Sequence, residues 1–334
     1  CQMYFYPLWV RIFWTIVSVL AYPLVSFVLF IKCSKVKYEY KVEAIAADHK
    51  MEEVIPLGLR NSYDIHHKEW NAGCALSKED FKYIFKNIVG FRHPFFILKT
   101  TIQIASYSAR ITRYTPDVII THGEYSFCSS ALTDYCHSKG VKHINVMHGE
   151  KLFYIRDSFF HFDECFVWDQ HYIDLFVAIK AESSQFKIAI PPSMIIDMGS
   201  NINQKAYSDY KYYLASDNEE QIKSIVESMQ FAKRENKKVK YRIHPRYTDI
   251  DVLLKYVSDT DIEYPSEISI LESIANSNYV IGSYTTVLLQ ACMAGKQIVL
   301  DDVTYHKRYY QLENYGYILA EKQHIKLSDL QKTI

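Results

Sequence analysis

From residue 116 onward, short apolar runs alternate with segments of helical length, and this alternation constrains the fold more than any other feature. The runs "PDVII", "KHINV" and "ECFV" are separated by helix-forming stretches such as "SSALTDYCHSKG". A second series contains "KYYLAS", "KVKYRI", "NYVIGS" and "KQIVLDD", again with helical segments between the runs. Strands that alternate with helices of this length form parallel sheets with crossover helices. The sequence therefore predicts an α/β protein with two Rossmann-like domains facing a cleft.

The domain boundaries follow from length and from one interruption of the pattern. A chain of 334 residues is long for a single hydrophobic core. The polar stretch around Pro191-Pro192 separates the two series and predicts a hinge. We expect an apolar segment at residues 1–32, a first domain at 33–195 and a second domain at 196–334. Within the first domain, "YEYKVEAIAA" predicts a strand, and "SKEDFKYIFKNIVG" and "FFILKTTIQIASYSARITRY" predict helices.

Charge and cysteine content exclude several classes of protein. The chain has 38 Lys+Arg and 38 Asp+Glu, so it lacks the basic excess of a nucleic-acid-binding protein. Its seven cysteines are scattered and contain no C-x-x-C pair, which predicts neither a disulfide framework nor a zinc site. We expect buried free thiols in a reducing compartment, no metal and no nucleic-acid partner.

Residues 12–31, "IFWTIVSVLAYPLVSFVLFI", contain no charge and are about long enough to cross a bilayer. One positive charge, Arg11, precedes this segment, and three lysines follow it: Lys32, Lys35 and Lys37. The greater positive charge on the C-terminal side predicts that the main body lies at the cytoplasmic face of a cell membrane. The alternatives are a buried helix pair broken at Pro23, an in-plane membrane anchor, or the end of a longer region that begins upstream.

Four loops follow predicted strands, at the sheet edge where parallel α/β folds bind ligands: 121–126, 147–154, 243–248 and 282–286. Two of them repeat His-Gly-Glu. Gly123 and Gly149 would let the backbone turn sharply or approach a ligand closely. Glu124, Glu150 or His148 would serve as a general base. Alternatively, each glutamate caps the next helix and each histidine packs locally.

The loop "GSYTT" carries hydroxyl groups just before a predicted helix. Ser283, Thr285 and Thr286 would bind a phosphate, because hydroxyls and backbone N–H groups at a helix N-terminus attract anions. The alternative is ordinary N-capping of the helix.

The loop "IHPRYT" begins where proline ends a predicted strand. This places His244 at the carboxyl end of the sheet, where a protonated imidazole would stabilise a departing phosphate. Arg246, after Pro245, would add a bidentate phosphate donor. The alternative is a surface histidine before a turn.

Taken in order, these loops resemble those of GT-B glycosyltransferases, and more narrowly of the bacterial sialyltransferases and polysialyltransferases that use CMP-activated sugars. His244-Pro245 matches the HP motif of those enzymes, and "GSYTT" matches the hydroxyl motif that holds the CMP phosphate. Their acidic motif, two carboxylates followed by glycine, is not matched, because this chain has Gly123-Glu124 and Gly149-Glu150 instead.

This resemblance implies an inverting, metal-independent bacterial transferase without a cofactor other than its nucleotide-sugar donor. The acceptor would be a cell-surface polysaccharide, such as capsule or lipopolysaccharide, or a lipid-linked glycan. The first domain would hold the acceptor and the base, and the second would hold the donor through His244, Pro245, Arg246, Ser283, Thr285 and Thr286.

Two further resemblances imply other substrates. The segments "INVMHGEKLF", "YRIHPR" and "YVIGSYTTVLLQACMAGKQIVLDD" are similar to the CDP-glycerol-dependent polymerases of teichoic acid synthesis, which implies His148 as the base. "PDVIITHGE" and the segments after it resemble UDP-N-acetylglucosamine 2-epimerases. A candidate from another class is a non-enzymatic membrane scaffold protein, in which the apolar segment is the functional part.

Overall fold

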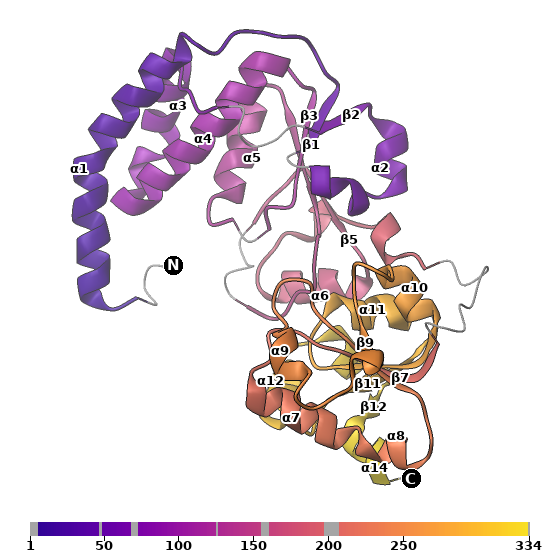
Figure 1. Cartoon of the computed structure of the whole chain (residues 1–334). Coiled ribbons are helices and arrows are strands. Elements are labelled where there is room, and N and C mark those ends of the chain that lie inside the picture. Colours follow the sequence, from indigo (N-terminus) through magenta and orange to yellow (C-terminus); the bar gives the residue numbers. More distant parts are fainter. Residues whose placement is uncertain are drawn as a thin grey trace. The chain divides into compact units, whose positions relative to one another are not determined.

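The computed structural model describes residues 6–46, 49–67, 73–124, 126–154, 160–196 and 207–332. The chain divides into two compact units (Figure 1). The first unit comprises residues 1–148 and 154–192, and the second comprises residues 149–153 and 193–334. The short segment 149–153 therefore belongs, by its contacts, to the second unit.

The first unit is built on a parallel six-stranded sheet with the strand order β2-β1-β3-β4-β5-β6. The strands are β1 Ala44–Ala46, β2 Ile65–His67, β3 Val118–Thr121, β4 Lys142–Val146, β5 Glu164–Val167 and β6 Phe186–Ile188. The helices are α1 Leu8–Cys33, α2 Leu57–Ser62, α3 Lys78–Asn87, α4 Pro94–Tyr114, α5 Ser129–Ser138 and α6 Gln170–Ala178.

Both faces of this sheet are covered, because successive residues of a strand point to opposite faces. Ile119 of β3 packs in a core cluster with α3, α4 and α5. Its neighbours Val118 and Ile120 pack in a second cluster that contains Leu59 of α2. A strand buried on both sides needs a continuous apolar run, which explains the sequence "VII" at this position.

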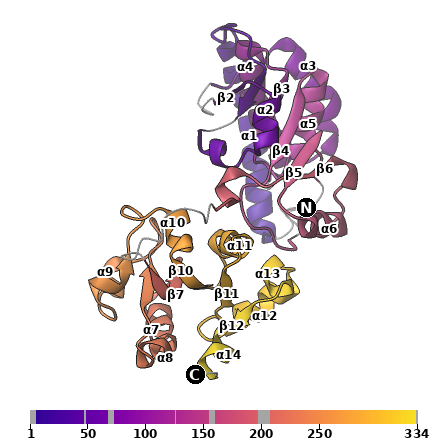
Figure 2. The ribbon, with the colours of Figure 1, turned by 90° about the vertical axis from the view of Figure 1, so that its right-hand side faces the viewer.

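The second unit has its own parallel six-stranded sheet with the order β12-β11-β10-β7-β8-β9. Its strands are β7 Ser208–Tyr213, β8 Val239–Arg242, β9 Ile262–Glu263, β10 Ser277–Gly282, β11 Gln297–Leu300 and β12 Ile325–Lys326. Its helices are α7 Glu219–Ser228, α8 Gln230–Arg234, α9 Ile250–Leu253, α10 Ile270–Ala275, α11 Thr286–Met293, α12 His306–Asn314, α13 Ile318–Glu321 and α14 Leu327–Lys332. Figure 2 shows β7, β10 and β11 at the centre of this unit, with helices around them.

The central strand β7 uses its two faces differently. Tyr210 and Tyr212 belong to the apolar core that also contains α7 and α14. Lys211 and Tyr213 contact Ser273 of α10, at 3.0 Å from the Lys211 Nζ to the Ser273 carbonyl and 2.8 Å between the two hydroxyls. The strand therefore separates an aliphatic and aromatic layer from a polar one.

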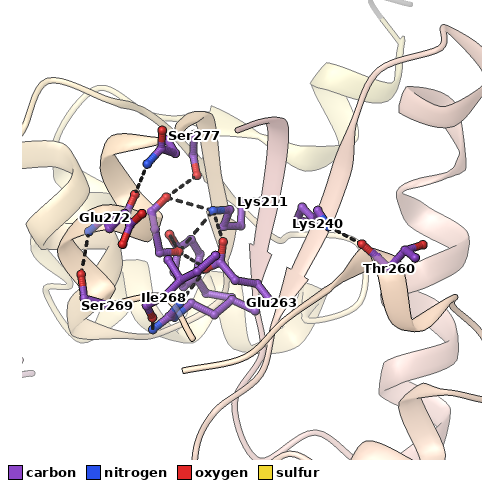
Figure 3. A network of polar contacts seen from close by, with 12 residues as sticks. Lys211, Lys240, Thr260, Glu263, Ile268, Ser269, Glu272 and Ser277 are labelled. Carbon is purple, nitrogen blue, oxygen red and sulfur yellow. Dashed lines mark hydrogen bonds and ion pairs between the residues drawn. The ribbon is translucent and has the colours of Figure 1, made fainter. Parts of the chain in front are cut away.

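That polar layer is a buried ion network joining β7, β8, β9 and α10 (Figure 3). The Glu263 carboxylate lies 2.5 Å from the Lys211 Nζ and 2.7 Å from the Arg242 guanidinium. It also accepts a hydrogen bond from Ser273. Burial alone would raise the pKa of Glu263, but the Lys211 and Arg242 charges outweigh it and hold the pKa below its ordinary value. The network fixes the end of β8, where the His244 loop begins.

The predicted α/β fold with two Rossmann-like domains behind an apolar helical segment is confirmed. The helix predicted from "SKEDFKYIFKNIVG" is α3, and Ser77 and Asp80 form a capping box at its start. The strand predicted from "YEYKVEAIAA" is shorter than expected and comprises only Ala44–Ala46.

The apolar segment is one helix, α1, of 26 residues that continues through Pro23. A helix pair broken at Pro23 is therefore wrong. The helix α4 lies beside α1 (Figure 1), and the ring centres of Trp14 in α1 and Phe95 in α4 are 5.7 Å apart. In the described part of the chain, α1 alone is long and apolar enough to cross a membrane.

Candidate functional site

In the first unit, the strand order reverses between the neighbours β1 and β3, and ligands of such sheets bind beyond the carboxyl ends at this point. β3 ends at Thr121 and leads into His122-Gly123-Glu124. The adjacent strand β4 ends at Val146 and leads to His148. The two His-Gly-Glu loops thus begin on neighbouring strands at one edge of the sheet.

These loops form what we call the histidine cluster: His122, Glu124 and His148. The His148 Nδ1 lies 3.1 Å from the Glu124 Oε1, and the rings of His122 and His148 are 4.6 Å apart. The Glu124 side chain is 1% exposed, whereas that of His148 is 34% exposed. Of the predicted bases, the structure therefore brings Glu124 and His148 together, and His122 joins them although we had not assigned it a role.

The burial of Glu124 decides which member of the pair meets a substrate. The 3.1 Å separation places the Glu124 carboxylate on the Nδ1 side of the His148 ring, which leaves the Nε2 side for other contacts. A side chain that is almost fully buried cannot reach an acceptor, but the partly exposed His148 ring can. Glu124 is thus the candidate positioning residue, and His148 is the candidate base.

A pocket opens beside the cluster within the first unit. It is lined by Gln103, Tyr107, Thr121, His122, Gly123, Ser126, Ser129, Leu132, His143 and Phe162. His143 is buried at its wall and hydrogen-bonds through its two ring nitrogens to the hydroxyls of Thr133 (2.8 Å) and Tyr107 (3.1 Å). The pocket therefore presents hydroxyl, amide and imidazole groups, which suit a hydroxylated ligand.

The two loop glycines do not adopt a backbone conformation that requires glycine. Neither Gly123 nor Gly149 has the positive φ that only glycine adopts readily. A Cβ atom added at Gly149 would meet nothing within 4 Å. Gly123 begins a turn, because its carbonyl accepts a hydrogen bond of 2.8 Å from the Ser126 N–H. Close approach of a ligand to either glycine stays a prediction.

Glu150, the third candidate base, is grouped with the second unit, although we had expected it in the first domain. It is 7% exposed, and its backbone carbonyl accepts a hydrogen bond of 3.5 Å from the Tyr284 hydroxyl. The backbone N–H of Phe153 donates to the Tyr315 carbonyl at 2.7 Å. These contacts anchor the segment 149–153 in the second unit, where Glu150 borders the loop after β10.

In the second unit, the strand order reverses between β7 and β10, which is the arrangement of the Rossmann fold. Gly282 ends β10, and a Cβ atom there would lie 3.4 Å from the Tyr213 carbonyl of β7. Glycine thus allows the two strand ends to approach closely. A pocket lies at this point, lined by Tyr212, Tyr213, Ala215, Asp217, Ser283, Tyr284, Thr285, Tyr305 and Arg308.

The predicted hydroxyl residues take three different positions. Ser283 lines the pocket, and its buried hydroxyl has no hydrogen-bond partner among the residues that the structure describes. Thr285 also lines the pocket and caps α11, accepting a hydrogen bond of 3.4 Å from the Val287 N–H. Thr286 is the first residue of α11 and is not among the lining residues. Of the three, Ser283 is therefore the strongest candidate for a phosphate ligand.

Sequence reasoning missed Arg308 in the first turn of α12. This exposed residue lines the pocket, and its guanidinium lies 5.4 Å from the Tyr284 ring centre and 5.9 Å from that of Tyr305. No ion pair to it is found within the described ranges. The local sequence "HKRYY" does not indicate that this arginine faces a pocket. Its position there depends on the order of the strands in the sheet, which local sequence does not reveal.

Two carboxylates near the pocket have structural roles. Asp217 accepts hydrogen bonds from the Ala215 N–H at 2.7 Å and from the Tyr305 hydroxyl. The Asp301 carboxylate accepts a hydrogen bond of 2.5 Å from the Tyr212 hydroxyl, and burial raises the pKa of the Asp301 carboxyl. Both side chains hold the strand-end loops in place.

His244 lies at the end of β8, as predicted, but it does not line the pocket. The backbone N–H of His244 donates a hydrogen bond of 2.8 Å to the Thr248 hydroxyl, and that hydroxyl donates one of 3.2 Å to the Ala215 carbonyl. The His244 loop is thus attached to a residue of the pocket wall. Pro245 and Arg246 are exposed and are not lining residues.

The surroundings of His244 favour the neutral form of its imidazole. Burial lowers the pKa of the His244 imidazole below 6.5, and the Arg246 charge lowers it further. The Nδ1 accepts a hydrogen bond of 3.1 Å from the Arg246 N–H, which leaves the proton of the neutral ring on Nε2. His244 would therefore offer a phosphate a neutral N–H donor at pH 7, where we had expected an imidazolium.

No group of three or more His, Cys, Asp or Glu side chains in the described part of the chain is arranged to hold a metal ion. The six cysteines that the structure describes are free thiols, and three of them, Cys128, Cys136 and Cys165, are buried.

Comparison with solved structures shows a fold likeness. S. aureus MnaA, solved with UDP, superposes with a TM-score of 0.52 at 12% identity over 87% of each chain. A Listeria monocytogenes protein assigned as a UDP-N-acetylglucosamine 2-epimerase gives 0.52 at 11% identity, over 81% of this chain and 82% of that one. The wall teichoic acid polymerase TagF gives 0.49 at 10% identity, over 98% and 88%. No protein-family model and no curated protein sequence matches the chain. The two likenesses with a TM-score above 0.5 support the two-domain GT-B type of fold.

Proposed function

We propose that this protein is an inverting transferase that uses a nucleotide-activated donor, with His148 as general base and the second-unit pocket as the donor phosphate site. The single observation that carries the proposal is the buried Glu124 at 3.1 Å from the Nδ1 of a partly exposed His148. A buried carboxylate behind a histidine is the arrangement that orients an imidazole for proton transfer.

In the first unit, the reaction would begin with an acceptor hydroxyl bound in the pocket beside His122. His148 would take the hydroxyl proton on Nε2 while the oxygen attacks the donor. The electron pair of the broken donor bond would leave with the nucleotide phosphate. Glu124 would stabilise the imidazolium that forms.

In the second unit, the leaving phosphate would meet donors that are already in place. Ser283 offers a buried hydroxyl, the first turn of α11 offers backbone N–H groups, and Arg308 offers a guanidinium. Tyr284 and Tyr305 flank Arg308 and hold it over the pocket. These groups suit one or two phosphates.

Two donor classes follow from the sequence resemblances: a CMP-sugar such as CMP-sialic acid, and CDP-glycerol. The histidine cluster favours the second candidate. The sialyltransferase resemblance requires an acidic motif whose carboxylate meets the acceptor, but Glu124 is buried behind His148. The CDP-glycerol resemblance implies a histidine base at position 148, which agrees with the geometry. In both cases CMP would be the leaving group.

A donor panel tests the proposal. The purified chain is incubated with CMP-sialic acid, CDP-glycerol or UDP-N-acetylglucosamine, together with sialyl-oligosaccharides or glycerol phosphate oligomers as acceptors. Released CMP and any epimerised sugar nucleotide are quantified by chromatography, with His148→Asn as the matched control. We expect CMP release from CDP-glycerol or CMP-sialic acid that depends on acceptor and is lost in His148→Asn. Epimerisation of UDP-N-acetylglucosamine, or no reaction with any donor, would contradict the proposal.

A further inference from the structure

In its N-terminal half, the helix α1 has two faces of different composition. One stripe, which we call the outer stripe, contains only large apolar side chains at helical spacing, and each is about half to three-quarters exposed: Trp9, Phe13, Ile16, Leu20, Leu24, Phe27 and Ile31. The opposite face carries Arg11, Thr15 and Ser18, followed by Val25 and Leu29. All polar residues of this helix before Ser26 thus avoid the outer stripe.

The inner face is packed on the first unit. Ser18 and Leu29 are buried, and Val25 packs on the core cluster that contains α4 and α5. The Leu76 N–H donates to the Leu29 carbonyl at 3.2 Å, and the Phe30 and Phe81 rings lie 6.1 Å apart. The helix is therefore docked along its inner side while its outer stripe has no covering in the described chain.

Docking on α4 excludes a membrane-spanning position for α1 in this conformation. A helix that crossed the bilayer while packed along α4 would carry α4 into the hydrocarbon. Lys99 lies one turn from Phe95, the residue of α4 that contacts Trp14, and Arg113 lies near the end of the same helix. Each charged residue at the centre of a bilayer costs about 3 kcal/mol or more. A helix lying in the plane of the surface avoids this cost.

The charges at the C-terminal end of α1 identify the kind of surface. Lys32, Lys35 and Lys37 are exposed, and Lys78 lines a pocket with Phe30 and Ile31 at this end. Lysines next to apolar side chains attract anionic headgroups above an acyl layer. Phe85, one turn beyond Phe81 on α3, is 77% exposed and extends the apolar surface.

We propose that α1 lies in the plane of an anionic lipid bilayer, with the outer stripe immersed to a shallow depth and the first unit outside the hydrocarbon. Only 11% of the most apolar 18-residue window is buried in the protein itself, so most of its apolar surface is open to a lipid partner. The inference does not depend on the donor or on the catalytic role of His148.

Vesicle flotation tests the partner. The full chain is mixed with vesicles of phosphatidylcholine alone or with 30% phosphatidylglycerol, at low and high salt. We expect binding that is stronger with phosphatidylglycerol and weaker at high salt. Leu20→Glu with Leu24→Glu should lower the partition coefficient tenfold or more, while Leu254→Glu, at an exposed leucine of the second unit, should leave it unchanged. Absence of binding, or equal loss in both variants, would overturn the proposal, as would a dimer in solution that binds no vesicles.

Depth-dependent quenching tests the orientation. Three variants each keep one tryptophan, at position 9 or introduced as Leu20→Trp or Ile31→Trp, and the other tryptophans are changed to phenylalanine. The quenching of tryptophan fluorescence is measured with lipids brominated at defined positions along the acyl chain. An in-plane helix predicts the same shallow depth at all three positions. A spanning helix predicts that position 20 lies near the bilayer centre and positions 9 and 31 near its surfaces, and that profile would overturn the proposal.

Discussion

Glu124 and His148 differ in role because they differ in exposure, although both belong to the same repeated tripeptide. The buried carboxylate holds the Nδ1 of the imidazole at 3.1 Å, and the imidazole keeps a partly exposed edge. The motif His-Gly-Glu in a sequence indicates that a histidine and a glutamate are available to act as a general base. Only the fold decides which of them faces a substrate and which stands behind it.

His143 should make the stability of the protein depend on acid. Burial lowers the pKa of its imidazole from 6.5 to about 3, so it stays neutral in the folded chain. Below pH 6.5 the unfolded chain binds a proton that the folded chain does not, so this group lowers the unfolding free energy as the pH falls from 6.5 to about 3. The slope is at most about 1.4 kcal/mol per pH unit.

The substitution His143→Gln removes this group and should flatten the slope, although it also costs stability at neutral pH because the hydrogen bonds to Thr133 and Tyr107 are altered. Urea unfolding at several pH values between 6.5 and 4 measures it, with the exposed His306→Gln as control. A wild-type slope in His143→Gln would show that the buried histidine does not carry the effect.

Arg308 and Arg246 are both exposed arginines, but only Arg308 lines the pocket of the second unit. We expect Arg308→Ala to weaken CDP binding about tenfold to a hundredfold, the usual loss for one charged hydrogen bond. Arg246→Ala should change it little. Calorimetric titration with CMP and CDP measures both variants. A loss confined to Arg246→Ala would return the phosphate role to the His-Pro loop.

Among the elements, the strands buried on both faces could be predicted from the sequence, because their apolar runs leave no alternative. β3, β4, β10 and β11 are of this kind. The short edge strands β2, β9 and β12 have only two or three residues each, and no run of that length stands out from a loop. They form because a neighbouring strand offers its backbone groups.

The site was predictable to a similar extent. His148 and Ser283 could be placed at strand ends from the sequence because both follow a strong strand signal, and their catalytic and binding roles stay predictions. His122, His143 and Arg308 were not assigned, since their positions depend on which strands become neighbours. Strand order is a property of the sheet and not of local sequence.

The network of Glu263 with Lys211 and Arg242 should hold β7, β8 and β9 together. Glu263→Gln leaves two buried cations without their carboxylate, so we expect it to lower the unfolding free energy by about 3–5 kcal/mol. The stability from Glu263 exists above its ordinary pKa of 4.5 and is lost as the pH falls below that value, because the folded pKa is lowered.

Urea unfolding of the full chain at pH 7 measures this loss. A matched control is Glu219→Gln, which breaks the surface pair with Lys255 at 3.0 Å, where both side chains are half exposed. Exposed pairs of this kind contribute about 1 kcal/mol or less. Equal effects of the two substitutions would contradict the importance of the buried network.

At the scale of the whole molecule, each unit has a pocket near the point where its strand order reverses. The first unit's pocket adjoins the histidine that we propose as the base, and the second unit's pocket is lined by the residues that we propose as phosphate ligands. The two functions therefore depend on different residues. Substitutions in one unit should affect proton transfer, and substitutions in the other should affect donor binding.

The most direct test of this account compares nucleotide binding with single-turnover CMP release in wild type, His148→Ala and Glu124→Gln. We predict that both variants bind CMP and CDP like wild type but release CMP from the donor about 10²- to 10⁴-fold more slowly, with KM unchanged. The account would be contradicted if His148→Ala released CMP at the wild-type rate, or if either substitution abolished nucleotide binding.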